Sequence, residues 1–141
     1  MTPTSLQPVV LQVDPAVVRA YGELTNDNNP IHTDPVFAAN TPMGACIAHG
    51  TMSICLMWQS LFRTFTGLQP DQVELDVRFV KPVVVGVERL DLARGGQGAV
   101  VGAGGRQQEG RSDCFDIWVR GADAADRVVG TVRVQLDREA P

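Results

Sequence analysis

Residues 50–65 read GTMSICLMWQSLFRTF, and the run from Ile54 to Trp58 within them is apolar without a break. In a water-soluble protein, a helix that is apolar on most sides is covered by other elements rather than lying on a surface. We therefore expect a buried helix from Gly50 to about Phe65. A sheet formed by the rest of the chain then has to wrap around this helix.

The chain after this helix changes to the pattern of β-strands. Val73, Leu75, Val77 and Phe79 alternate with polar residues, which is the period of two of a strand with one buried face. Further strands are predicted over residues 87–92, 99–103, 114–120 and 128–136. Glycine-containing turns between them favour an antiparallel meander.

The chain before the helix supplies shorter elements. A strand is predicted over residues 9–13, and Asp14-Pro15 is a typical helix start, with the carboxylate as cap and proline at the first helical position. Asp34-Pro35 repeats this signal and predicts a second short helix. One buried helix and about five antiparallel strands place the fold in the α+β class.

Composition limits the function classes. The chain has 141 residues and a mass of 15.2 kDa, so we expect residues 1–141 to form one domain. A net charge of -4 without a basic run argues against a nucleic-acid partner, and no stretch is long enough to span a membrane. Three cysteines without a C-x-x-C pair are typical of free thiols in a reducing compartment, which predicts a cytoplasmic protein.

Candidate chemistry lies just before the long helix, where both histidines occur. Asp27 and His32 are separated by a turn that contains Pro30, and such a turn can bring both side chains to one point. A carboxylate and an imidazole that share a water molecule can deprotonate it and return a proton, which is general acid–base catalysis. The backbone N–H of Gly50, at the start of the helix, can stabilise negative charge on a carbonyl oxygen.

Three motifs carry a resemblance to a known family. Residues 24–34 (LTNDNNPIHTD) and 47–50 (IAHG) resemble the MaoC-like (R)-specific enoyl-CoA hydratases and dehydratases. In that family a Gly-Asp-x-Asn-Pro-(Ile/Leu)-His motif precedes an Ala-His-Gly helix start. Residues 77–86 (VRFVKPVVVG) are similar to the family's Arg-Phe-x-x-Pro-Val-x-x-Gly strand. The resemblance covers most of residues 10–92 and fades after them.

The resemblance implies a hotdog fold, in which an antiparallel sheet wraps round a long helix. A homodimer is expected because the other face of the sheet and its edges need cover. The resemblance also implies a lyase that hydrates trans-2-enoyl thioesters of coenzyme A or an acyl carrier protein, or dehydrates (R)-3-hydroxyacyl thioesters, without a metal or redox cofactor. Asp27 and His32 would be the catalytic pair, and the Gly50 N–H would form the oxyanion hole. Asn29, His49 and Trp58 are the candidate substrate-binding residues, with Asn29 mainly bracing the turn.

The sequence departs from the family at two positions. Asn26 stands where the family usually has glycine, and asparagine can also take a positive φ, so we expect the turn to persist. Trp58 stands where several members carry a small polar residue, and its indole ring can shorten the acyl pocket.

Four alternatives remain open at the level of the sequence. The protein can be a hotdog thioesterase that hydrolyses the same class of ligand, or a subunit that binds acyl thioesters without turnover. A metal site built from His32, Asp34 and His49 is conceivable because these ligand types suit zinc and iron, although no H-E-x-x-H spacing supports it. His49 can also orient its loop instead of contacting the substrate.

Overall fold

The structure is a computed structural model that describes residues 5–86, 88–91 and 112–135. Its long helix is α3 (Gly50–Thr64). The other elements are β1 (Val10–Val13), α1 (Pro15–Thr25), α2 (Pro35–Ala39), a 3-10 turn (Pro70–Gln72), β2 (Val73–Phe79), β3 (Glu88–Asp91), β4 (Ser112–Arg120) and β5 (Asp126–Gln135). The bounds of the helices and strands lie within two residues of the predicted ones, the 3-10 turn was not predicted, and the strand predicted over 99–103 lies outside the described residues. Within the described part, no helix is long and apolar enough to cross a bilayer.

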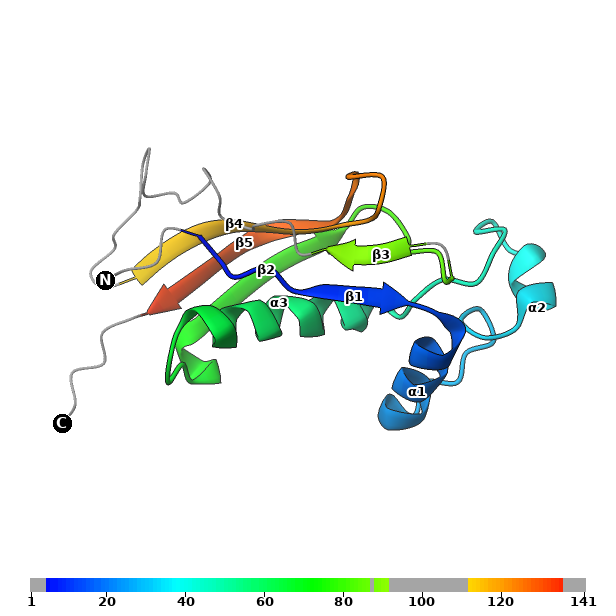
Figure 1. The fold of residues 1–141 in the computed structure, drawn as a ribbon, viewed down its shortest axis with the longest axis horizontal. Coiled ribbons are helices and arrows are strands. Elements are labelled where there is room, and N and C mark those ends of the chain that lie inside the picture. Colours follow the sequence, from blue (N-terminus) through cyan, green and yellow to red (C-terminus); the bar gives the residue numbers. More distant parts are fainter. Residues whose placement is uncertain (1–4, 87, 92–111, 136–141) are drawn as a thin grey trace.

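Five antiparallel strands form one sheet in the order β1-β3-β4-β5-β2, and α3 lies along one face of it (Figure 1). Strands β3, β4 and β5 form the predicted meander. The expectation that β2 continues it was wrong, because β2 pairs with β5 at the far edge. The segment after β2 makes no hairpin turn: Ala48 N donates to Val83 O (2.8 Å) and Val85 N to Cys46 O (2.9 Å), which carries the chain away from β2.

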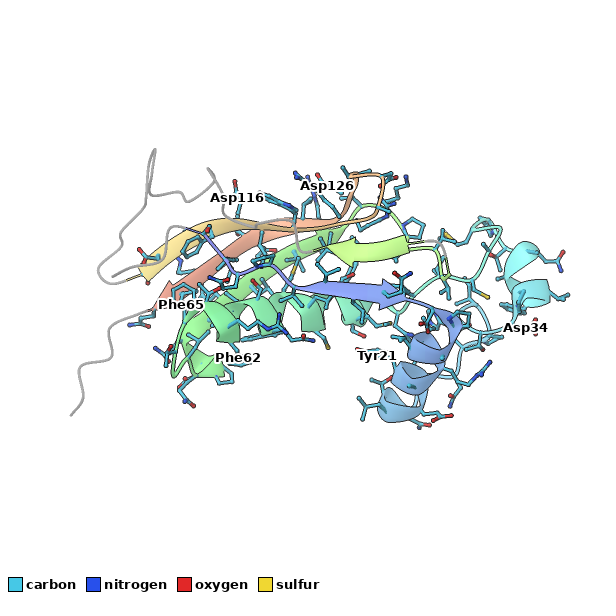
Figure 2. All side chains as sticks on the ribbon, in the orientation of Figure 1. Tyr21, Asp34, Phe62, Phe65, Asp116 and Asp126 are labelled. Atoms are coloured by element: carbon cyan, nitrogen blue, oxygen red, sulfur yellow. The ribbon has the colours of Figure 1, made fainter. Side chains whose placement is uncertain are left out.

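The core lies between the sheet and one face of α3. Met57 and Leu61 of α3 belong to the same buried cluster as Phe115 and Val132 of the sheet. Fully burying a side chain of this size contributes roughly 1.5–3 kcal/mol. The opposite face of α3 is open, however, because Phe62 is 47% exposed and points away from the sheet (Figure 2). The prediction that other elements cover most sides of the helix therefore holds for one face only.

Candidate active site

The end of α1 sets the position of Asp27. The helix begins at Asp14, whose Oδ1 accepts from Val17 N (2.8 Å), and it ends at Asn26 in the left-handed conformation, with a φ of 55°. Asp27 N then donates to Gly22 O (2.9 Å). Asparagine thus supplies the positive φ that the resemblance assigns to glycine, and the predicted turn is present.

The turn after Asp27 is braced by short side chains. Asn29 Oδ1 accepts from Ile31 N (3.1 Å), and Asn29 N donates to Asp27 Oδ1 (3.3 Å). Asp34, visible at the start of α2 in Figure 2, accepts from the backbone N–H groups of Val36 (3.0 Å) and Phe37 (3.2 Å) and so caps that helix. Asn29 therefore braces the turn as predicted, and its contact with substrate remains a prediction.

The turn brings Asp27 and His32 together, and the start of α3 adds His49. Asp27 Oδ2 lies 3.9 Å from the Nε2 atom of each histidine. The two imidazole rings are stacked, with centroids 3.8 Å apart and planes inclined by 26°. Residues that are 22 positions apart in the sequence thus share one site.

Hydrogen bonding shows which ring nitrogen of His32 is engaged by the protein and which one faces Asp27. Its Nδ1 lies 2.7 Å from Ile47 O, and a carbonyl oxygen only accepts, so the proton is assigned to Nδ1. In the neutral ring, the lone pair of Nε2 then faces the Asp27 carboxylate, whose side chain is 51% exposed. The separation of 3.9 Å is too long for a direct hydrogen bond, but one water molecule can contact both atoms. This geometry suits a pair that exchanges protons with a water molecule.

Gly50 is the first residue of α3, and His49 at the N-cap makes no side-chain hydrogen bond to the helix. The Gly50 N–H has no acceptor among the described residues, and Gly50 lines a cavity of about 340 Å³ together with His49 and Ser53. Phe79 also lines this cavity and is 57% exposed, so the prediction that it lies on a buried strand face was wrong. Phe79 belongs to β2, an edge strand of the described sheet.

Trp58 lies two helical turns beyond Gly50, and its ring stacks on Phe62 with centroids 5.7 Å apart. It does not line the cavity beside Gly50, nor a second cavity of about 310 Å³ that His32 lines with Arg19. Its contact with a substrate therefore remains a prediction.

Tyr21 of α1 is a further residue of the site, and it is not singled out in the sequence analysis above. Its ring packs on His49 with centroids 5.0 Å apart, and its hydroxyl lies 2.6 Å from Thr51 Oγ1 and 3.8 Å from Cys55 Sγ. Burial raises the pKa of the Tyr21 hydroxyl, so it is protonated at neutral pH. Helical spacing alone could not reveal a contact that depends on how α1 packs against α3.

Three groups of this site can in principle hold a metal ion. One ligand atom each of Asp27, His32 and His49 lies within 4.8 Å of the others. The set differs from the alternative named above, because Asp34 caps α2 instead. His49 Nε2 lies 3.1 Å from Asp27 O and donates to it, so ligation through this nitrogen requires breaking that hydrogen bond.

The fold and the site define a class: a curved antiparallel sheet on one long helix, with a carboxylate–imidazole pair beside the helix start. A family model described as "MaoC like domain" matches residues 3–93. The chain therefore belongs to the MaoC-like domain family.

Individual relatives agree with this assignment. The chain is 37% identical over 76 residues to 3-hydroxyacyl-thioester dehydratase X of Mycobacterium tuberculosis, covering 54% of this chain and 26% of that protein. It is 36% identical over 73 residues to the (R)-specific enoyl-CoA hydratase of Aeromonas caviae, covering 52% of this chain and 54% of that protein. The matches thus cover about half or less of the curated relatives' length.

A solved structure shows the fold. The (R)-hydratase from A. caviae involved in PHA biosynthesis superposes with a TM-score of 0.70 at 22% identity, covering 94% of both chains. The protein therefore has the hotdog fold that the resemblance implied.

Proposed function

We propose that this protein is a hydro-lyase that adds water to trans-2-enoyl thioesters or removes it from (R)-3-hydroxyacyl thioesters. The observation that carries the proposal is the Nε2 of His32, 3.9 Å from Asp27 Oδ2, beside a helix start whose Gly50 N–H has no acceptor in the described part of the chain. The similarity to a 3-hydroxyacyl-thioester dehydratase and an (R)-specific enoyl-CoA hydratase supports the same chemistry.

The geometry suggests how the residues divide the reaction. The Gly50 N–H binds the thioester carbonyl oxygen and stabilises the enolate charge that develops there. The Asp27–His32 pair takes one proton from the bound water as its hydroxyl adds to C3. The pair then returns a proton to C2, so that one water molecule is added across the double bond.

Incubation with crotonyl-CoA tests this proposal. We expect the absorbance of the conjugated enoyl thioester to fall without release of free thiol, and the product to be (R)-3-hydroxybutyryl-CoA. Thiol release would instead identify a thioesterase. Tight binding without turnover, on crotonyl-CoA as well as on carrier-bound and branched substrates, would identify a non-catalytic binding subunit.

We also propose that two copies associate and that the substrate is carried by coenzyme A or an acyl carrier protein. Within the described sheet β2 is an edge strand, and an edge strand offers unpaired backbone groups to a partner. Phe62 and Phe79 add exposed apolar surface, at 47% and 57%.

Two further proposals concern the whole chain. Residues 1–141 act as one domain, which is supported by one buried cluster of the described residues that includes both Leu6 and Val134. The protein works in the cytoplasm, which is supported by the free thiols of Cys46, Cys55 and Cys114.

A further inference from the structure

His49 has no role in the reaction proposed above, although it lies next to Asp27 and His32. The residue is 3% exposed and occupies the N-cap of α3 without capping the helix through its side chain. Its imidazole ring lies in contact with two other rings, Tyr21 at 5.0 Å and His32 at 3.8 Å between centroids. The His49 ring therefore has little freedom to rotate.

One hydrogen bond defines the chemical state of His49. Its Nε2 lies 3.1 Å from Asp27 O, so the proton is assigned to Nε2. Its Nδ1 is buried without a hydrogen-bond partner among the described residues, and a proton there would have no acceptor. His49 is thus a donor, with the opposite tautomer to His32, whose Nδ1 is protonated.

The peptide group that accepts this hydrogen bond is also held from a second side. A Cβ atom at Gly22 would lie 2.8 Å from Asp27 O, so only glycine at position 22 allows this carbonyl to pack against α1. The Asp27 peptide is held between α1 and His49. Because the Asp27 carboxylate is attached to this peptide, its position relative to His32 depends on both contacts.

We propose that His49 is a positioning residue for the Asp27–His32 pair. Its Nε2–H fixes the Asp27 carbonyl and thereby the position of the attached carboxylate. The kinetic consequence rests on the proposed function, whereas the tautomer of His49 does not.

The tautomers can be measured without any activity. The protein contains two histidines, so ¹⁵N NMR of histidine-labelled protein, assigned with His49→Gln, resolves each ring. We expect Nδ1–H for His32 and Nε2–H for His49. An Nδ1–H tautomer at His49 would overturn the proposal, even if the protein proved not to be a hydratase.

Two substitutions separate the hydrogen bond from the ring. His49→Gln keeps an N–H donor near the place of Nε2, and His49→Phe keeps a ring but no donor. Groups that orient metal ligands typically contribute about 10–100-fold, and by analogy we expect His49→Phe to lower kcat for crotonyl-CoA hydration by about 10–100-fold with little change in KM. His49→Gln should recover most of the loss.

Gly22→Ala and Asp14→Ala complete the comparison. The methyl group of Gly22→Ala pushes on the Asp27 carbonyl, so kcat should fall here too, although alanine favours helix. Asp14→Ala removes the cap at the other end of α1 and should lower Tm while leaving kcat unchanged.

Wild-type kcat in folded His49→Phe, no recovery in His49→Gln, or a loss confined to KM would each contradict the proposal. A wild-type enzyme without hydratase activity would instead contradict the proposed function.

Discussion

Asp123, in the turn between β4 and β5, collects three hydrogen bonds on one exposed carboxylate. Its Oδ1 accepts from Ala125 N (2.9 Å) and from Arg127 Nη2 (3.0 Å), and its Oδ2 accepts from Lys81 Nζ (3.4 Å). The Ala125 hydrogen bond, followed by that of Arg127, lowers the pKa of Asp123 from 3.8 to about 2. A single residue thus ties the hairpin to the segment that follows β2.

This lowered pKa predicts an effect of acid on stability. The folded state holds the Asp123 proton less tightly than the unfolded state. The stability that the ionised Asp123 carboxylate adds to the fold is therefore complete above pH 3.8 and is lost as the pH falls towards about 2. The urea midpoint of wild type should exceed that of Asp123→Asn at pH 5, and the gap should shrink over this window. A gap that stays constant from pH 5 to pH 2 would show that the carboxylate charge does not stabilise the hairpin.

At the same scale, the sequence predicted part of the site. Asp27, His32 and Gly50 could be found because a turn and a helix start are local features, and the structure brings Asp27 and His32 next to His49, the residue before Gly50. The environment of His49 could not be found, because it depends on Asp27 O, 22 positions away, and on the rings of Tyr21 and His32. The role of Gly22 could not be predicted either. Glycine disfavours a helix, and the contact with Asp27 O that requires it appears only in the folded structure.

At the scale of elements, α3 has two different faces. Met52, Leu56 and Leu61 are buried against the sheet, whereas Phe62 and Cys55 are exposed on the other side. The run from Ile54 to Trp58 is apolar all round in sequence, so it predicted burial but could not show that one face has no cover within the described part of the protein. The position of β2 at the sheet edge could not be predicted from the sequence either. It depends on the pairing of residues 83–85 with 46–48, which leads the chain away from β2.

The open face of α3 leads to a prediction about association. Apolar side chains on such a face are typical of an interface, so we expect a solution mass of twice the 15.2 kDa of one chain. Phe62→Glu, which places a charge on this face, should shift light-scattering masses towards the monomer. Val10→Glu is the control. Val10 is also an exposed apolar side chain, but it lies on β1, at the sheet edge opposite β2, so this variant should remain a dimer. A monomeric wild type, or equal effects of both changes, would contradict the proposed interface.

At the scale of the whole molecule, the α+β class and the position of most elements followed from periodicity and from helix caps. Asp14 and Asp34 cap α1 and α2 as predicted, because a cap is a contact between close neighbours in sequence. The order of the strands required long-range pairing that no local pattern encodes. The fold brings the turn after α1 to the start of α3, and so places Asp27 and His32 beside a helix start whose first N–H, that of Gly50, has no acceptor among the described residues.

The central claim is that Asp27 and His32 act together on one water molecule. The most direct test is kcat/KM for crotonyl-CoA hydration by wild type, Asp27→Asn and His32→Ala, with circular dichroism and Tm as controls for folding. General acid–base groups typically contribute about 10²–10⁴-fold, so each variant should lose at least about 100-fold while remaining folded. Wild-type-like turnover in either folded variant would contradict the account.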